Sequence, residues 1–270
     1  MIVAPDPMSY RIEDGVRATE RERSRLLALA RTRDPQTIRV LSRVGIAPGW
    51  RCLEVGAGSG SISRWLALQV QPRGCVLSVD IDLRFHCDPT DGMEVRRLDV
   101  VRDPLPEHAF DLVHARAVLE HLTEREEVLD RFVAATRPGG WIVVEDGEWQ
   151  AFLAQPLPEP LSSVARWMHA GLRARTGWDP MLGGRLLRMF AERGLIELDI
   201  VGESRVMQGG DDSIRWWSAG IEHSADRMVE AGLVTREQID GALELVQSPD
   251  FVMMSPLSIA VRGRVPGAKP

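Results

Sequence analysis

The sequence predicts an α/β protein built on a doubly wound, mainly parallel sheet, and three observations support that fold class. Residues 53–61 (LEVGAGSGS) describe an apolar strand that breaks into a glycine turn and then opens a helix. A second apolar strand ends at Asp80, about twenty positions after Gly60. Further strands alternate with helical segments, an order that favours parallel pairing with helices on both faces of the sheet.

The elements follow one another in a regular order along the chain. The first helices are expected at 16–32 and 34–46, the second because Asp34 and Pro35 form a good helix start. The five core strands are expected at 51–56, 75–80, 94–98, 109–115 and 140–146. Beyond a segment with regularly spaced prolines, we expect helices at 160–175 and 182–193 and a strand at 195–202. A helical stretch at 211–247 and a last strand at 251–262 follow.

Composition limits the class of protein. The chain has 270 residues, enough for one large α/β domain with insertions. Its net charge is −6 and its basic residues are spread out, which argues against a nucleic-acid partner. No apolar run approaches the ~18 residues that a membrane helix needs, and the N-terminus lacks the basic start and apolar core of a signal peptide. We therefore expect a cytoplasmic protein with no membrane partner.

The cysteines and histidines give no sign of a metal site. The three cysteines, Cys52, Cys75 and Cys87, lie in or beside predicted strands and lack metal-ligand spacing. No two histidines or acids show such a spacing on one face either. We therefore expect small core cysteines and no bound metal.

The glycine turn is the most informative motif. Glu54 is followed by Gly56, Gly58 and Gly60, and glycines let a ligand approach bare backbone. Dinucleotides, nucleoside triphosphates and S-adenosylmethionine are all bound at turns of this kind. The dinucleotide pattern is broken because Ser63 replaces its third glycine, and the phosphate-loop lysine is absent near Gly60. A ligand with an adenosine head and an amino-acid tail fits best.

Acidic residues at two strand ends support an adenosine ligand. Asp80 ends the second strand, where a carboxylate accepts hydrogen bonds from ribose hydroxyls in dinucleotide folds. Asp82 is a second candidate, but it should point away if the strand continues. Asp99 ends the third strand and could accept the adenine amino group, with Val100 packed on the ring.

Later motifs connect the chain to a known family. Residues 110–122 (FDLVHARAVLEHL) and 137–146 (RPGGWIVVED) follow the sequence VDID at 79–82. This ordered set resembles the class I S-adenosylmethionine-dependent methyltransferases, most closely the small-molecule, natural-product type common in actinobacteria. The resemblance covers residues 50–146 and continues more loosely to about 264. It implies a Rossmann-like, seven-stranded sheet whose last strand is antiparallel, with S-adenosyl-L-methionine as cofactor and S-adenosyl-L-homocysteine as product.

The resemblance also implies a domain arrangement and a set of cofactor contacts. Residues 1–48 are expected to form an N-terminal helical lid and 49–264 the methyltransferase domain, with substrate-capping insertions at about 150–180 and 205–247. Tyr10, the only tyrosine, matches a position that closes over the methionine end of the cofactor; alternatively, it orders a flexible arm. The cofactor contacts are expected from Glu54, Gly56, Ala57, Gly58, Gly60, Asp80, Ile81, Asp99, Val100 and Arg116.

Methyl transfer depends on alignment more than on acid–base help, but a phenol, amine or indole acceptor must still lose a proton. His121, just after the fourth strand, is the first candidate for the base; the alternative is a helix cap. Glu145 and Asp146 end the fifth strand and could hold an N–H or O–H of the acceptor, or cap the next segment. His114 is expected in the core, and Arg116 could contact the cofactor carboxylate, the acceptor or a salt-bridge partner.

The tryptophans are the one hint about the acceptor. Five of the eight fall in the predicted insertions: Trp149, Trp167, Trp178, Trp216 and Trp217. Broad aromatic faces suit a flat acceptor such as an indole; alternatively, these residues anchor the lid or a homodimer contact. The favoured prediction is therefore methylation of an aromatic small molecule at C, N or O.

Two other functions stay open on the sequence. A methyltransferase acting on protein or RNA would need a basic face or an added recognition domain, and neither is visible. A non-methylating cyclase or binding protein could keep the same cofactor residues on the same fold. The complete glycine turn with Asp80 favours methyl transfer over this last alternative.

Overall fold

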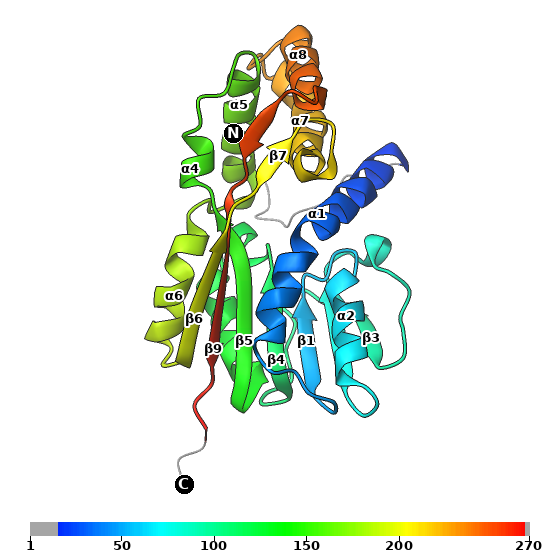
Figure 1. The fold of residues 1–270 in the computed structure, drawn as a ribbon, viewed down its shortest axis with the longest axis vertical. Helices are drawn as coiled ribbons and strands as arrows, with labels where there is room; N and C mark the ends of the chain where they lie inside the picture. Colours follow the sequence, from blue (N-terminus) through cyan, green and yellow to red (C-terminus); the bar gives the residue numbers. More distant parts are fainter. Residues whose placement is uncertain (1–15, 268–270) are drawn as a thin grey trace, which may run out of the picture.

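The computed structural model describes residues 16–267, which form a central sheet with a largely helical cap above one end (Figure 1). The sheet has seven strands in the order β3-β2-β1-β4-β5-β9-β6. Their bounds are β1 Arg51–Val55, β2 Cys75–Asp80, β3 Met93–Arg97, β4 Phe110–Arg116, β5 Thr136–Glu148, β6 Ile196–Glu203 and β9 Leu257–Arg264. Strands β1 to β5 pair in parallel, whereas β9 is antiparallel to both β5 and β6. The predicted Rossmann-like fold with an antiparallel last strand is confirmed.

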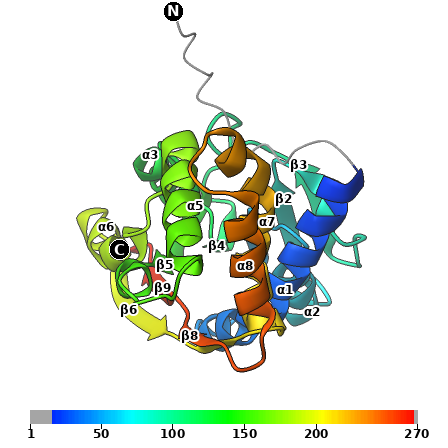
Figure 2. The same ribbon diagram turned by 90° about the horizontal axis from the view of Figure 1, so that it is seen from above.

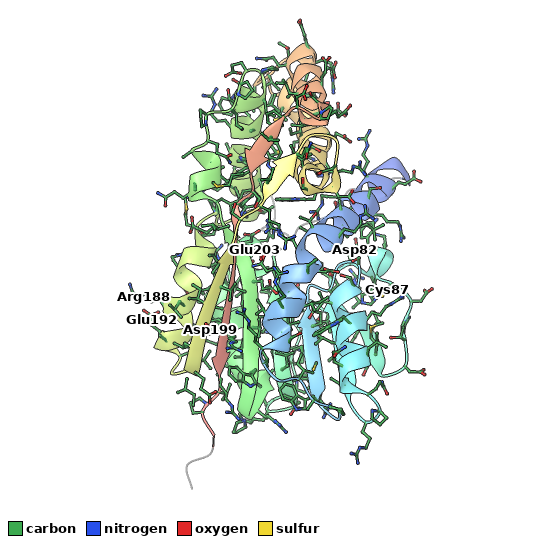
Figure 3. The ribbon with its side chains drawn as sticks, viewed as in Figure 1. Asp82, Cys87, Arg188, Glu192, Asp199 and Glu203 are labelled. Carbon is green, nitrogen blue, oxygen red and sulfur yellow. The ribbon has the colours of Figure 1, made fainter. Side chains whose placement is uncertain are left out.

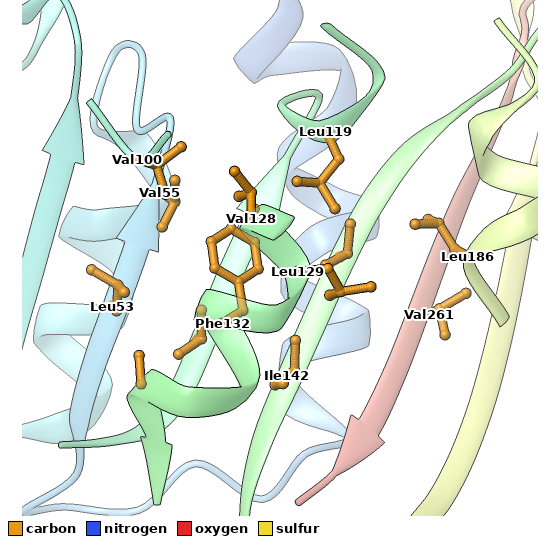
Figure 4. Packing of buried hydrophobic residues seen from close by; sticks show 14 of the residues in the cluster. Leu53, Val55, Val100, Leu119, Val128, Leu129, Phe132, Ile142, Leu186 and Val261 are labelled. Atoms are coloured by element: carbon orange, nitrogen blue, oxygen red, sulfur yellow. The ribbon is translucent and has the colours of Figure 1, made fainter. Parts of the chain in front are cut away.

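Helices cover both faces of the sheet. On one face lie α1 (Val16–Ser42) and α2 (Ser61–Val70), and on the other α3 (Arg125–Ala135) and α6 (Leu182–Glu192). Figure 4 shows Phe132 and Leu129 of α3 packed against the strands on the face that α3 and α6 cover. Neighbouring strand residues point to opposite faces. Leu53 and Val55 therefore face α3, which directs Glu54 to the face covered by α1.

The cap comprises four helices and a two-stranded ribbon: α4 (Gln150–Leu153), α5 (Leu161–Thr176), α7 (Asp212–Glu230), α8 (Arg236–Gln247), β7 (Val206–Gln208) and β8 (Val252–Met254). Figure 2 shows α5, α7 and α8 lying over the sheet when the molecule is seen from above. The cap has a buried core of its own, in which Trp149 packs edge to face on Phe152 and Trp178. Because Trp149 directly follows β5, this core lies at the carboxyl ends of the parallel strands.

Helix α1 is continuous, which corrects the prediction of two helices. Pro35 lies inside it, where proline removes one backbone hydrogen bond. The helix persists because one half packs on the sheet through Val40 and Leu41, while Ala28 in the other half joins the core of the cap. Tertiary packing of both halves therefore outweighs the local break that Asp34 and Pro35 predict.

Smaller corrections concern the ends of elements. The predicted helical stretch 211–247 breaks after α7, at Gly232 with φ 67°, and Thr235 then starts α8 with a capping box. The predicted last strand divides into β8 and β9, because Pro256 between them lacks a backbone N–H. The segment after β4 forms a short 3₁₀ turn, η2 (Leu119–His121). The fifth strand, expected at 140–146, begins earlier, at Thr136.

Candidate active site

The glycine turn joins β1 to α2 and has the backbone that its sequence predicts. Gly56, Gly58 and Gly60 have positive φ angles of 66°, 54° and 74°, a region that side chains disfavour. A Cβ at Gly56 would lie 2.3 Å from Val118 Cγ2. A Cβ at Gly58 would have one neighbour within 4 Å among the described residues, Leu26 of α1. The turn therefore brings the Gly58 backbone close to α1.

Asp80, at the end of β2, supports the same turn. Its Oδ2 accepts the Gly58 N–H at 2.8 Å, and its Oδ1 accepts the Asp82 N–H at 2.9 Å. Burial raises the pKa of Asp80, and these two donors oppose part of the rise. Asp82, labelled in Figure 3, is instead paired with Arg84 at 2.7 Å, which lowers the pKa of Asp82. Because each carboxylate oxygen has a second lone pair, Asp80 can still accept hydroxyl groups.

The other predicted cofactor residues of this edge serve local structure as well. Ala57 donates its N–H to a carbonyl of β2 at 3.1 Å. Asp99 Oδ1 accepts a backbone N–H two residues further on at 3.0 Å. Ile81 is 37% exposed, whereas Val100 is 8% exposed and packs in the sheet core. Their contacts with a cofactor stay predictions.

The donor and acceptor groups of this edge fit S-adenosylmethionine. In dinucleotide folds, the N–H groups at the glycine turn face a pyrophosphate. Here the Gly58 N–H is held by the Asp80 carboxylate, so a phosphate would meet a negative charge. Backbone N–H groups and a carboxylate suit ribose hydroxyls and an amino-acid tail, which S-adenosylmethionine carries.

A buried ionic group crosses the three central strands beneath α1. His114 of β4 lies between Glu54 of β1, at 2.6 Å from Nδ1, and Glu145 of β5, at 3.1 Å from Nε2. All three side chains are almost completely buried. Burial lowers the pKa of His114, but the two carboxylates outweigh it and raise the value to about 9. His114 is therefore an imidazolium that donates to both acids, and the Glu54 and Glu145 carboxylates contact His114.

Arg116 ties the end of β4 to α1. Its guanidinium contacts Asp34 at 2.9 Å and donates to Thr37 Oγ1 at 2.8 Å, so it is a salt-bridge residue in this structure. The next residue, Ala117, has a φ of 53°, which is unusual for a residue with a side chain. Its N–H donates to the Glu145 carbonyl at 2.7 Å. This strained residue lies where the rim of the sheet meets η2.

His121 lies at the end of η2 beside a buried acid that sequence reasoning missed. Glu120 Oε1 is 3.4 Å from His121 Nε2, while Oε2 accepts the Gly147 N–H at 2.9 Å and Trp149 Nε1 at 3.4 Å. Burial lowers the pKa of His121, which favours the neutral imidazole. The Glu120 N–H donates to Asp146 Oδ1 at 3.4 Å. The structure thus brings together His121, Glu120 and Asp146, and the position of Glu120 directly before His121 was the available signal.

Asp146 differs from its neighbour Glu145. Burial raises the pKa of Asp146 well above its usual range, and the nearby Glu120 adds to the rise. Asp146 Oδ2 is buried without a hydrogen-bond partner among the described residues. A protonated carboxyl group at this position can donate a hydrogen bond, whereas the expected role was to accept one from an N–H or O–H of the methyl acceptor.

The tryptophans of the predicted insertions are mostly buried in the cap. Trp149, Trp178, Trp216 and Trp217 are 2–9% exposed, whereas Trp167 is 36% exposed. His169 packs among them and accepts Trp217 Nε1 at 3.2 Å, and burial lowers the pKa of His169 to about 4. These rings therefore form the core that anchors the cap. Tyr10, predicted to close over the cofactor, lies outside the described residues.

Comparisons with known proteins agree with this fold. A family described as a methyltransferase domain matches residues 53–144. A methyltransferase of Strobilurus tenacellus, str2, is 31% identical over 139 residues, which cover 48% of this chain and 49% of that protein. The chain thus spans about half the length of this relative.

Solved structures with the same fold are more distant in sequence. The YcgJ protein from Bacillus subtilis has a TM-score of 0.56 at 14% identity, covering 85% of this chain and 97% of that one. Phosphoethanolamine N-methyltransferase 2 of Haemonchus contortus, solved with S-adenosylhomocysteine, has a TM-score of 0.52 at 15% identity and covers 90% and 57%. These likenesses concern the fold.

The strand order, the glycine turn with Asp80 and the matching family define a Rossmann-like methyltransferase domain. The chain therefore contains a methyltransferase domain, and its sheet order is that of the class I, S-adenosylmethionine-dependent type.

Between residues 16 and 267, no three histidine, cysteine, aspartate or glutamate side chains are grouped so that they could hold a metal ion. Every helix described is too short or too polar to cross a membrane.

Proposed function

We propose that this protein transfers a methyl group from S-adenosylmethionine to a small molecule with an aromatic ring. The observation that carries the proposal is the His121–Glu120 pair at the junction between the sheet and the aromatic cap. When bound, the cofactor supplies an electrophilic methyl group on its sulfonium. The chain must then align the acceptor and exclude water, and a closed cap over the strand ends suits both tasks.

The proposed cofactor contacts lie at the glycine turn and the adjoining strand ends. Asp80 accepts the ribose hydroxyls through the lone pairs that its backbone donors leave open. Asp99 accepts the adenine amino group, as predicted from the third strand. Glu54 acts differently from this expectation, since its carboxylate contacts His114; we propose that it positions the turn from below.

The proposed base is His121, positioned by Glu120. Glu120 fixes one ring nitrogen at 3.4 Å and is itself fixed by Gly147 and Trp149. The other ring nitrogen is then the one that receives the proton from the acceptor. Because burial lowers the pKa of His121, the ring is neutral and able to act as a base at pH 7.

A small acceptor is favoured over a macromolecule for two reasons. The net charge of −6 provides no general attraction for RNA. The cap also covers the strand ends with its own packed core, which leaves room for a small molecule more readily than for a protein segment. The sequence alternatives of protein or RNA methylation are therefore secondary.

The test is methyl transfer from labelled S-adenosylmethionine to a panel of indoles, phenols and amines, with products identified by mass. Binding of S-adenosylhomocysteine is measured separately by calorimetry. We expect one added methyl group on an aromatic panel member, and His121→Gln should lower kcat about 100-fold with cofactor affinity unchanged. The control is His108→Gln, because His108 lies before β4, at the end of that strand away from η2.

The outcomes separate the competing functions. Transfer to protein or RNA with none to the panel would favour a macromolecular acceptor. Binding of S-adenosylhomocysteine without transfer to any acceptor would shift the conclusion to a non-methylating cyclase or binding protein. Equal loss of activity in both histidine variants would remove His121 from the role of base.

A further inference from the structure

Arg33 of α1 is a buried cation without a direct acidic partner. It is 8% exposed, and its guanidinium carbon lies 5.5 Å from the centre of the Trp216 ring in α7. Among the side chains that the structure describes, its guanidinium has no hydrogen bond and no ion pair. Burial lowers the pKa of Arg33 to about 10, and Arg116 adds to the fall. The group is still charged at neutral pH.

Two neighbouring arginines, Arg116 and Arg205, differ from Arg33 because each has an acidic partner. Arg116 contacts Asp34 and Thr37. Arg205 pairs at 2.6 Å with Glu203, labelled in Figure 3 at the upper end of β6, and also donates to the Thr32 carbonyl at 2.9 Å. Both act electrostatically on Arg33. A buried cation in such surroundings is costly unless something anionic contacts it.

Other buried groups beneath the cap that lack a partner are hydrogen-bond donors, and one of them belongs to Trp216 itself. Within the described chain, the indole nitrogens of Trp216 and Trp178 are buried and have no partner, and both rings pack on Trp149. Asp146 Oδ2 is also buried without a partner there, and its neutral carboxyl group can donate. Trp149 in turn contacts Glu120, beside His121. A ligand that supplies acceptor oxygens and a negative charge would satisfy this set.

We propose that Arg33 binds a carboxylate of the methyl acceptor, so that the substrate is an aromatic acid. This inference rests on the proposed function, since it names the substrate class of that site. A carboxylate matches the planar guanidinium through two parallel hydrogen bonds. A phosphate dianion fits less well, because Glu120 and Glu145 also lie close enough to act electrostatically on Arg33. The unpartnered indole N–H groups are placed to bind further oxygens of the acid.

The binding test does not depend on turnover. It uses the whole protein with S-adenosylhomocysteine bound, and two matched probe pairs: 4-hydroxybenzoate with 4-hydroxybenzamide, and indole-3-carboxylate with indole-3-carboxamide. Calorimetry gives each Kd for the wild type, Arg33→Met and the control Arg39→Met, which removes an exposed arginine of the same helix. We expect the acids to bind at least ten-fold more tightly than the amides, and Arg33→Met alone to abolish that difference.

Several results would overturn the proposal. They are equal affinity for acid and amide in the wild type, no measurable binding of either acid, or an unchanged preference in Arg33→Met. If the acids bind through Arg33 but no probe or panel member is ever methylated, the proposed function fails while the anion site stands. The two conclusions can therefore fail separately.

A stability measurement distinguishes ligand binding from a structural role of Arg33. Replacing a buried cation that lacks a partner with an apolar side chain should stabilise the free protein, and we expect Arg33→Met to raise Tm by about 2–4 °C. Arg39→Met should change Tm by less than about 1 °C. A lower Tm with equal loss of affinity for acid and amide would mean that Arg33 mainly holds the cap through Trp216.

Discussion

The buried polar groups of the sheet and those beneath the cap differ in whether the chain supplies their partners. In the sheet, Glu54, His114 and Glu145 contact one another at 2.6 and 3.1 Å. Beneath the cap, the Arg33 guanidinium and Trp216 Nε1 have no hydrogen-bond partner in the part of the chain that the structure describes. Satisfied groups support the fold, whereas unsatisfied ones cost stability. A ligand is therefore expected beneath the cap, where the buried polar groups lack partners.

The two sets also arise from different levels of structure. Glu54 and His114 are direct partners in the register of neighbouring strands, so the sheet itself brings them together. Arg33 and Trp216 come from α1 and α7, which meet only when the cap docks on the long helix. The sheet set is thus part of the scaffold, and the cap set depends on how two layers are held relative to each other.

Removal of His114 tests the sheet side of the comparison and should have the largest effect. His114→Leu leaves two carboxylates in the core without their cation, and we expect a loss of about 3–5 kcal/mol in the free energy of unfolding. The measurement is urea denaturation at pH 7. His108→Leu, at an exposed histidine, is the control and should cost less than about 1 kcal/mol. Similar losses in both variants would contradict a scaffold role for the ionic group.

The pH dependence of stability should show the same group in the unmodified protein. The pKa of His114 is raised from 6.5 to about 9, so its contribution is fully present below pH 6.5. It is lost as pH rises through 9, and the expected loss is about 3 kcal/mol. Urea denaturation between pH 7 and 10 measures it. His114→Leu should lack this part of the slope, and parallel curves for the two proteins would argue against a charged His114.

Asp80 combines features of both kinds of buried group. Its carboxylate has partners within the chain, and it still has lone pairs that can accept hydrogen bonds from a ligand. Asp80→Asn should weaken S-adenosylhomocysteine binding about 10–100-fold, because a charge-assisted hydrogen bond to a hydroxyl is lost. Asp82→Asn is the matched control, and with its acid paired to Arg84 it should change the Kd less than about 3-fold. Calorimetry measures the Kd of S-adenosylhomocysteine for both variants. Equal changes in the two variants would contradict the assignment of the ribose site to Asp80.

The sequence predicted the scaffold better than the site. The alternating elements, the glycine turn and Asp80 at a strand end could be inferred because each depends on a few neighbouring residues. Glu120 was missed because it becomes significant only when η2 places it against Gly147 and Trp149. Arg33 was missed for a similar reason, since a single basic residue in a charged helix gives no sign that α7 will bury it.

One prediction failed because a local signal competes with tertiary contacts. Pro35 suggested a helix boundary, yet packing on both sides keeps α1 continuous. The tryptophans left two alternatives open, and the burial of four of them inside the cap favours the one in which they anchor it. In both cases the residue type was informative, but its role depended on which layer covered it.

The smallest predicted effect concerns Ala117, where the sheet scaffold meets the proposed site. Its positive φ of 53° costs an alanine about 1–2 kcal/mol, and a glycine would relieve that strain while losing about 0.5–1 kcal/mol through its freer unfolded chain. Ala117→Gly should therefore raise Tm by about 1–2 °C, measured by calorimetry.

His108→Gly, at φ 49° before β4, at the end of that strand away from η2, is the matched control and should give a similar small gain. The two variants differ in position relative to η2, since Val118 follows Ala117 and packs on the glycine turn. Methyl transfer should therefore fall in Ala117→Gly and stay constant in His108→Gly. If both variants keep full activity, the conformation of Ala117 does not affect methyl transfer. The proposed site then begins at Glu120 and His121.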